Sequence, residues 1–289
     1  MKPNLISEES ENDEKGDFIQ ISGHKGICKS ASSKTIYKKL KNGNNENYAY
    51  LKAMEDEYAR VCIPRFFRAL KDGDQALIEL ENLMQYFKSP NIMDIKLGCR
   101  TFEENEVQST VLREDLYDKM LKLYPDCCSE EEKREKAVTK LRYMQVREKM
   151  STTSKLSFRI EAVHSSTAKY SQDVKKITNS VQVLDCFKFF LNKAHDKRLL
   201  ETLVERIKQL RCNIENSEFF QTHQIIGSSL LLIHDGSNCG AWIIDLAHAI
   251  PAPDGIQRLN HRSDWKFGNG EDGILTGLDN IIRLFRSFL

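Results

Sequence analysis

An acid and a base lie two residues apart in the segment from Pro90 to Gly98, at Asp94 and Lys96. In an extended segment the side chains of residues i and i+2 point to the same side, so these two would project together. A carboxylate and an ammonium group on one face can orient a hydroxyl group and neutralise a phosphate. The alternative is an exposed ion pair on an edge strand, which is common and contributes little to stability.

Three more polar residues stand where a nucleotide phosphate could be held. Asp245 ends the apolar run that begins at Ala241, and Ser229 precedes the apolar run 230–234. A carboxylate and a hydroxyl group at the base of such a hairpin could hold Mg2+, because Mg2+ binds few protein oxygens and fills its other positions with water and phosphate. Lys38 lies on an early strand and could reach the phosphates, as the strand lysine of protein kinases does. The plain structural alternatives are a capping acid and a solvated lysine.

A third group combines cations with one aromatic hydroxyl group. Lys140, Tyr143 and Arg147 have the spacing i, i+3 and i+7, which places them on one face of a helix. Arg113 lies on the helix expected before this one. Charge-assisted hydrogen bonds to phosphate are strong and short, so such a face suits a small molecule that carries several phosphates. The alternative is a solvated basic face or a helix that binds a protein partner.

The composition narrows the classes of function. The chain has 289 residues, and its net charge of +1 gives no general reason to expect nucleic acid or an acidic membrane as a partner. No cysteine pair has C-x-x-C spacing and no histidine pair has H-x-x-x-H spacing, so we expect reduced thiols and no zinc site. No apolar run is long enough to span a bilayer, and residues 1–16 lack the apolar core of a secretory signal. These features predict a cytoplasmic protein.

The elements that position these residues are a β-rich first part and a helix-rich second part, which predicts an α+β fold. Residues 1–17 resemble a disordered acidic tail. In the first part we expect a glycine turn at 23–26 in a hairpin of strands 18–22 and 35–38, a helix over 46–60 and a strand over 75–80. Beyond residue 90 we expect helices over 103–123, 129–150, 181–194, 199–214 and 272–288, and strands over 157–161, 230–234 and 241–245.

Several motifs, in one order, resemble the inositol phosphate kinase family. Pro90, Asp94, Lys96 and Gly98 match its signature P-x-x-x-D-x-K-x-G. Later family blocks are matched by residues 226–231, 242–245 and 272–280. Residues 21–26 and 137–145 are similar to the catalytic domain of one subgroup, the inositol 1,4,5-trisphosphate 3-kinases. The resemblance runs from about residue 18 to residue 289.

The resemblance implies a two-lobed kinase-like fold, related to ATP-grasp enzymes and protein kinases. The lobes would be a β-rich nucleotide lobe over 18–89 and a C-terminal lobe over 90–289, with a helical insertion at about 101–161 that holds the inositol phosphate. The implied reaction is ATP- and Mg2+-dependent phosphorylation of inositol 1,4,5-trisphosphate on its 3-hydroxyl group, which gives the 1,3,4,5-tetrakisphosphate. We expect a monomer without bound nucleic acid or membrane insertion. We expect no calmodulin binding, because residues 1–17 lack the tryptophan-bearing segment of animal relatives.

Carried onto this chain, the roles of the family fall on residues of both lobes. Catalysis would depend on Lys96, Asp94 and Asp245, with Lys96 between the γ-phosphate and the 3-hydroxyl group. Ser229 and Asp245 would hold Mg2+. The nucleotide would be bound by Lys38, the hinge residues Glu81, Asn82 and Leu83, and Asp94, Ser229 and Asp245. The substrate would be bound by Lys96, Arg113, Lys140, Tyr143, Arg147 and His164.

The chain departs from the family pattern at five positions near the expected ligands. His164 replaces a lysine that touches the substrate. Leu141, Val146, Asn82 and Leu246 replace a proline, a tryptophan, an aspartate and a phenylalanine. None of these changes removes a reacting group, so we expect activity, with altered affinity and selectivity.

Two other functions fit parts of the sequence. A multikinase of broader specificity has a shorter insertion and a more open site, and the length of the segment 101–161 therefore favours the selective 3-kinase. An inert inositol phosphate sensor or scaffold is disfavoured, because the reacting groups are all present. These are Lys38, Asp94, Lys96, Ser229 and Asp245.

Overall fold

The computed structural model describes residues 28–40, 45–191 and 197–289, and its first four strands form an antiparallel sheet with the order β1-β2-β4-β3. The strands are β1 (Cys28–Ser30), β2 (Thr35–Lys39), β3 (Phe66–Asp72) and β4 (Gln75–Glu81). Helix α1 (Asn45–Glu55) packs on this sheet, where the rings of Tyr50 and Phe66 stack. The predicted β-rich start is therefore present, and β3 is a further strand that was not predicted.

The first hairpin differs from the predicted one. β1 pairs with β2 across the turn at residues 31–34, with Cys28 opposite Lys38. The hydroxyl group of Ser32 holds this turn, because it accepts hydrogen bonds from the backbone amides of Lys34 and Thr35. A serine turn therefore forms the tip of this hairpin. The predicted glycine turn 23–26, strand 18–22 and tail 1–17 lie outside the described residues.

A second four-stranded sheet has the order β11-β10-β5-β8 and carries Asp94 and Lys96. Its strands are β5 (Asn91–Leu97), β8 (Phe158–His164), β10 (Ser229–His234) and β11 (Cys239–Ile244). Side chains alternate along β5, so that Met93, Ile95 and Leu97 face the apolar core whereas Asp94 and Lys96 face the opposite side. The polar pair therefore projects away from the core that the helices cover.

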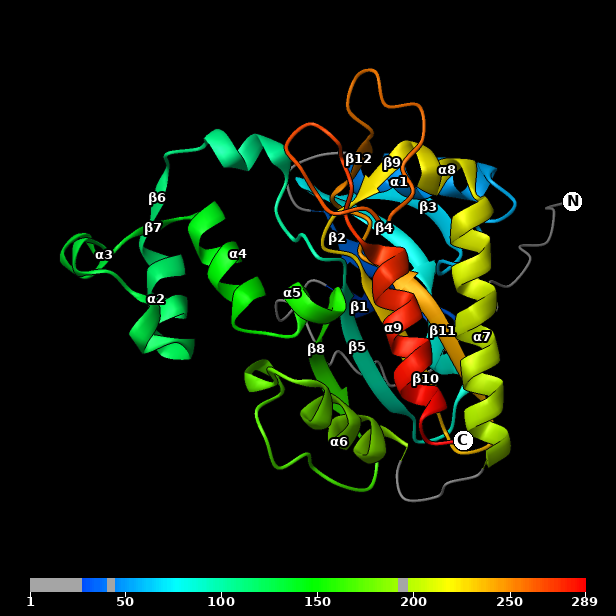
Figure 1. Ribbon diagram of the computed structural model, residues 1–289. Helices are drawn as coiled ribbons and strands as arrows, with labels where there is room; N and C mark the ends of the chain where they lie inside the picture. The colour runs from blue at the N-terminus through cyan, green and yellow to red at the C-terminus, as the bar shows by residue number, and fades with distance from the viewer. Residues whose placement is uncertain (1–27, 41–44, 192–196) are drawn as a thin grey trace, which may run out of the picture.

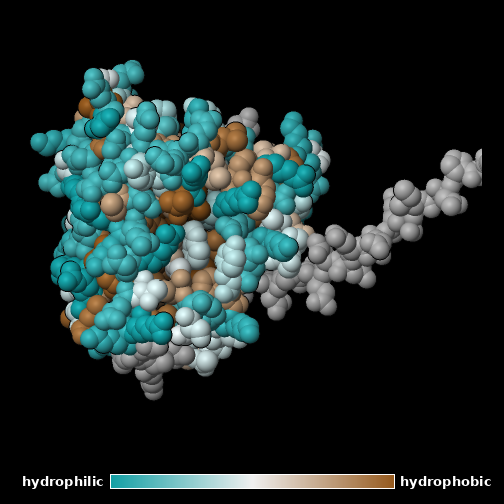
Figure 2. Space-filling view, turned by 90° about the vertical axis from the view of Figure 1, so that its right-hand side faces the viewer, coloured by the Kyte–Doolittle hydropathy of each residue, from teal (hydrophilic) through white to brown (hydrophobic). Residues whose placement is uncertain are grey.

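Three helices cover the apolar face of this sheet (Figure 1). They are α6 (Ser180–Phe190), α7 (Lys197–Asn216) and α9 (Ile274–Arg286). In α7 the buried residues follow helical spacing, as at Leu200, Leu203, Val204 and Ile207. Figure 2 shows the side of the molecule on which α7 lies, and this surface is mainly hydrophilic with small separate hydrophobic groups. The apolar sides of these helices are therefore used within the core.

The chain between β5 and β8 forms a helical region that extends to the left in Figure 1. Its elements are η2 (a 3-10 helix, Glu104–Gln108), β6 (Leu112–Arg113), α2 (Glu114–Leu123), η3 (Pro125–Cys127), α3 (Glu130–Glu135), β7 (Val138–Thr139), α4 (Lys140–Lys149) and α5 (Thr153–Leu156). The region has its own apolar cluster, in which Tyr117, Met120, Val138 and Val146 are buried. We call it the insertion; it ends before β8, which confirms the strand predicted over 157–161.

Both long helices predicted within the insertion are wrong in extent. The predicted helix 103–123 consists of η2, an extended segment with β6, and then α2. The predicted helix 129–150 divides into α3 and α4, because Lys136 adopts a left-handed conformation with a φ of 52° and β7 then pairs with β6. The predicted helix start at Ser129 is confirmed, since its hydroxyl group accepts a hydrogen bond from the amide of Glu132.

The remaining elements connect these parts. They are η1 (Leu83–Tyr86), η4 (Val174–Lys176), α8 (Glu218–Thr222), and the paired strands β9 (His223–Ile225) and β12 (Ala249–Pro251). The helix predicted over 46–60 ends at Glu55, because the carboxylate of Asp56 accepts hydrogen bonds from the amides of Tyr58 and Ala59 and so forms a turn. Within the described ranges, no helix has the length and apolar character needed to cross a membrane.

Candidate active site

Asp94 and Lys96 lie on an interior strand. β5 pairs with β10 on one side and with β8 on the other. Asp94 is only 2% exposed, and the partly buried Lys96 donates a hydrogen bond from Nζ to the backbone oxygen of Gly227. Lys96 lies opposite Ser229 in the antiparallel ladder, which places both side chains on the same face. The alternative of an exposed ion pair on an edge strand is therefore wrong.

Lys38 connects the first sheet with the end of β11. Its Nζ lies 2.6 Å from Glu46 on α1 and 2.5 Å from Oδ1 of Asp245. Burial alone would lower the pKa of Lys38, but the carboxylates of Asp245 and Glu46 outweigh burial, and the pKa lies well above its usual value. Lys38 is therefore a fixed positive charge between the two sheets.

Glu46 is a site residue that sequence reasoning missed. It is 5% exposed and lies in the first turn of the helix that follows the lysine strand. Protein kinases hold their strand lysine with a glutamate from the next helix in a similar way. An acid at the start of a helix after Lys38 was therefore the signal that could have identified Glu46.

Ser229 and Asp245 lie together at the base of the β10–β11 hairpin. Ser229 is in register with Ile244, the residue before Asp245. The hydroxyl oxygen of Ser229 is buried and has no hydrogen-bond partner among the residues that the structure describes. Asp245 adopts a left-handed conformation with a φ of 65°, which is strained for a residue other than glycine. A buried, unsatisfied hydroxyl group beside a strained aspartate is typical of a ligand-binding site.

The oxygen atoms of Ser229 and Asp245 fit the requirements of Mg2+. This ion prefers oxygen ligands, and proteins usually bind it through one or two side chains while water and substrate phosphates fill the other positions. No cluster of three or more histidine, cysteine, aspartate or glutamate residues suited to a metal exists in the described ranges. The pair therefore suits an ion that is also bound by nucleotide phosphates.

The predicted hinge residues lie at the end of β4. Leu83 is buried and begins η1, and the side chain of Asn82 caps this turn by accepting a hydrogen bond from the amide of Met84. The side-chain amide of Asn82 also donates a hydrogen bond to the backbone oxygen of Ser33, and the backbone N–H of Asn82 donates one to the backbone oxygen of Lys34. Asn82 therefore ties the hinge to the β1–β2 turn.

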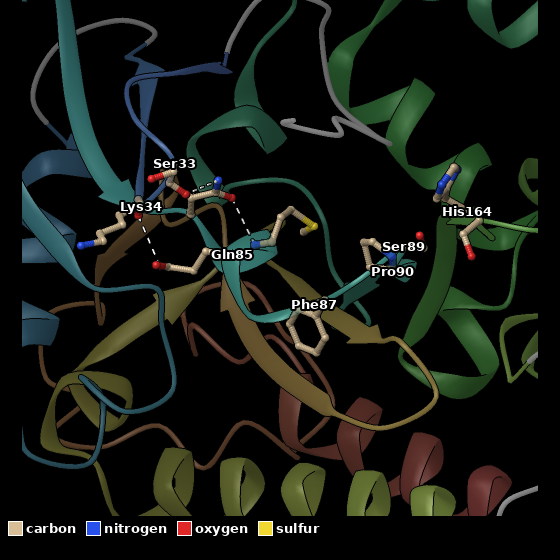
Figure 3. A pocket seen from close by; sticks show the side chains of 10 residues that line it. Ser33, Lys34, Gln85, Phe87, Ser89, Pro90 and His164 are labelled. Carbon is tan, nitrogen blue, oxygen red and sulfur yellow. Dashed lines mark hydrogen bonds between the residues drawn. The ribbon is translucent and has the colours of Figure 1, made fainter. Parts of the chain in front are cut away.

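A cavity of about 690 Å3 opens beside this hinge (Figure 3). Ser33 and Lys34 lie on one side of it and His164 on the other, with Phe87 between them in this view. His164 is in register with Ile92 on β5, whereas Lys96 is in register with Arg159. The structure therefore places His164 beside the hinge and not beside the cations of α4. Glu81, the last residue of β4, accepts a hydrogen bond from Tyr86.

The predicted substrate cations of the insertion each pair with a carboxylate. The pairs are Arg113–Asp115, Lys140–Glu106 and Arg147–Glu161. The side chains of the three cations are 48%, 35% and 5% exposed, in that order. A phosphate would therefore have to compete with a carboxylate for each of them.

The predicted cations do not all share one element. Lys140, Tyr143 and Arg147 lie on α4 as predicted, and Tyr143 packs partly buried against the apolar cluster of the insertion. Val146, on the same helix, is buried in that cluster. Arg113 lies on β6, before the start of α2, so its assignment to a helix is wrong. Figure 1 shows β6 on the side of α4 away from β5.

Arg147 connects the insertion with the second sheet. Its Nη1 donates to the hydroxyl group of Tyr124 at 2.9 Å, and its Nη2 lies 3.4 Å from Glu161 on β8. Burial raises the pKa of Glu161, but the charges of Arg159, Arg147 and Lys96 outweigh it, and the pKa lies below its usual value. Glu161 was not predicted as a site residue. It lies at a β-bulge in β8, where it has no paired residue on β5.

The sequence model of the inositol polyphosphate kinase family matches residues 77–286. The inositol-trisphosphate 3-kinase homolog of Caenorhabditis elegans is 40% identical over 270 residues, and inositol-trisphosphate 3-kinase A of Homo sapiens is 38% identical over 275 residues. The matches cover 92% and 93% of this chain, but 54% and 59% of the two relatives. The chain therefore spans little more than half the length of these curated relatives.

The crystal structure of inositol phosphate multikinase Ipk2 from S. cerevisiae, in complex with ADP and Mn2+, has a similar fold. The TM-score is 0.55 at 17% sequence identity, and the match covers 88% of this chain and 99% of the multikinase chain. This likeness confirms the predicted two-lobed kinase-like α+β fold. The match to the family model over most of the chain, with the two relatives at 40% and 38% identity, establishes that this protein belongs to the inositol polyphosphate kinase family.

Proposed function

We propose that this chain transfers the γ-phosphate of ATP to the 3-hydroxyl group of inositol 1,4,5-trisphosphate and so forms inositol 1,3,4,5-tetrakisphosphate. The observation that carries the proposal is the group of charges at Asp245, where Lys38 bridges Asp245 and Glu46 beside the buried hydroxyl group of Ser229. Such a group suits nucleotide phosphates. The two relatives named inositol-trisphosphate 3-kinases support the choice of substrate.

In this proposal the protein contributes position and positive charge. Phosphoryl transfer needs little covalent help, so catalysis depends on alignment and on stabilising the charge of the transferred group. Lys96 orients the 3-hydroxyl group and neutralises the transferred phosphoryl group, and Lys38 binds the nucleotide phosphates. Asp94 binds the ribose side of the nucleotide. Mg2+, held by Asp245 and Ser229, would add positive charge at the phosphates.

The nucleotide and the inositol phosphate would bind to different parts of the chain. Residues 18–89 form the nucleotide lobe, with Glu81, Asn82 and Leu83 as its hinge, and residues 90–289 form the second lobe. The segment 101–161 receives the inositol phosphate, and the separate sheets and the separate apolar cluster of the insertion support this division. ATP and Mg2+ are the proposed cofactors of a monomeric cytoplasmic enzyme.

A product assay tests the proposed function. The protein is incubated with ATP, Mg2+ and, in turn, several inositol tris- and tetrakisphosphates, and the new phosphate is located in each product by NMR. We expect turnover of inositol 1,4,5-trisphosphate with the new phosphate on position 3, and much slower turnover of the others. Similar turnover of several inositol phosphates would favour the multikinase, and binding without turnover would favour the sensor.

A further inference from the structure

Glu106 binds two partners through its two carboxylate oxygens. Oε2 accepts a hydrogen bond from the backbone amide of Glu103 at 3.2 Å, which closes the first turn of η2. Oε1 pairs with Nζ of Lys140 on α4. The side chain of Glu106 is 17% exposed and that of Lys140 is 35% exposed. The ion pair is therefore partly shielded from water but still open to a ligand.

The turn that carries Glu106 lies between α4 and the loop that follows Asp245. Glu103, the N-cap residue of the same turn, pairs with His248, which is on that loop. Glu104 accepts a hydrogen bond from the indole N–H of Trp265 at 2.8 Å, which fixes the turn from the other side. The turn with Glu106 therefore contacts both the loop after the proposed metal ligand Asp245 and helix α4, which carries the proposed substrate cations.

The three cation–carboxylate pairs of the insertion differ in whether a phosphate could replace the carboxylate. Arg147 is only 5% exposed and is held by Tyr124 as well as by Glu161, so a phosphate would have to be buried to reach it, which is unfavourable. Arg113–Asp115 is exposed, and exposed pairs contribute little. Lys140–Glu106 lies between these extremes, because it is partly shielded and adjoins the loop after Asp245.

We propose that Glu106 is a specificity-determining residue, because its carboxylate occupies the ammonium group of Lys140 and must release it before a substrate phosphate can bind there. This inference rests on the proposed function and on Lys140 as a phosphate ligand. A carboxylate that stays nearby repels the incoming phosphate, and the repulsion grows with each further phosphate near Lys140. Glu106 therefore weakens the binding of all inositol phosphates, and most of all those with an additional phosphate.

The variant E106Q removes the charge and keeps the turn, because glutamine serves as well as glutamate at this capping position. E132Q is a matched control in the same insertion. Glu132 is also 17% exposed, and its Oε2 also accepts a backbone amide hydrogen bond, from Ser129. Its Oε1 pairs at 2.6 Å with Arg142, another cation of α4 that we do not place at the substrate.

The first measurement is the dissociation constant of inositol 1,4,5-trisphosphate by calorimetry without ATP, together with KM and kcat. We expect E106Q to lower the dissociation constant and KM about three- to fivefold, as for loss of a partly exposed ion pair, with kcat within about twofold. E132Q should leave these constants within about 1.5-fold of the original protein. An unchanged or raised dissociation constant in E106Q, or an equal decrease in E132Q, would overturn the proposal.

Two further arms isolate the role of Lys140 and of phosphate number. In the K140A background E106Q should have a smaller effect, because there is no ammonium group to release and only the direct repulsion between Glu106 and a phosphate is removed. The gain in E106Q should be larger for inositol 1,3,4,5-tetrakisphosphate than for the trisphosphate. A gain of the same size in the K140A background as in the original protein, or equal gains for the two ligands, would contradict a specificity role. If the unmodified protein neither binds nor phosphorylates the trisphosphate, the proposed function fails too; if it does both, only the inference on Glu106 is at risk.

Discussion

Lys96 projects from an interior strand on the same face as Ser229, so its loss should affect phosphoryl transfer more than nucleotide binding. We expect Lys96→Ala to lower kcat by about 100-fold or more, because charge stabilisation of the transferred group is lost. KM for ATP should change by less than about threefold, since Lys38 and the hinge remain. Steady-state kinetics with Lys71→Ala, an exposed strand lysine, as control measures both constants. Near-normal turnover in Lys96→Ala would show that Lys96 does not take part in phosphoryl transfer.

The residues that the sequence analysis missed are the carboxylate partners of the cations that it found. Lys140 and its missed partner Glu106 are 34 residues apart; Lys38 and Asp245 were both found, but their pairing across 207 residues was not predicted. Periodicity places Lys140 and Arg147 on one helix face, because that is a property of the local chain. Which acid meets which base depends on how distant elements pack, so no local pattern predicts these pairs.

At the scale of elements, the same distinction separates the accurate predictions from the inaccurate ones. The strands of the β10–β11 hairpin were predicted to within two residues at each end, because alternation and a short polar loop are local signals. The helix predicted over 129–150 is broken by the pairing of β7 with β6, which are distant in sequence. Thr139 is a local signal for the start of α4, because its hydroxyl group accepts a hydrogen bond from the amide of Arg142. Lys136 carries no breaking signal such as proline or glycine, so the end of α3 there is a consequence of tertiary structure.

Helix α4 should depend on Arg147 for its attachment to the second sheet. Arg147→Met should lower the free energy of unfolding by about 1–3 kcal/mol, because Tyr124 and Glu161 lose a buried hydrogen-bond partner while Glu161 keeps its ion pair with Arg159. It should also raise KM for the inositol phosphate, since α4 carries the proposed substrate residues. Urea denaturation and kinetics test both effects. The control is Arg142→Met, whose 39% exposed side chain should cost less than about 1 kcal/mol; equal losses in both variants would contradict the connecting role.

At the scale of the whole molecule, a buried histidine joins the segment before α9 to the core. His261 is 1% exposed, with Nδ1 2.9 Å from Asp272 and Nε2 2.7 Å from the backbone oxygen of Phe220. Both neighbours are acceptors, so both ring nitrogens must donate and the ring is charged. Burial alone would lower the pKa of His261, but Asp272 outweighs it and the pKa is raised.

The free energy of unfolding should therefore fall as the pH rises above about 6.5. A histidine with a raised pKa in the folded state gives its full stabilisation below its pKa in the unfolded chain, and loses it as the pH rises through the folded value. Each unit of the raised pKa corresponds to about 1.4 kcal/mol. Burial lowers the pKa of His223 and His234, so above about pH 7 both are neutral in either state and add no slope.

Urea denaturation at several pH values between about 7 and 8.5 isolates this contribution. Buried thiols such as Cys62, whose pKa is raised by burial to about 12, add a slope as the unfolded thiol ionises at about pH 8.5, but they are the same in each variant, so this slope cancels when the profiles are compared. The variant H261Q can form hydrogen bonds but cannot titrate, so its stability should be lower at pH 7 and should change less with pH. H234Q should keep the original slope, because His234 is neutral in this range. Parallel profiles for the unmodified protein and H261Q would mean that His261 is uncharged in the folded state.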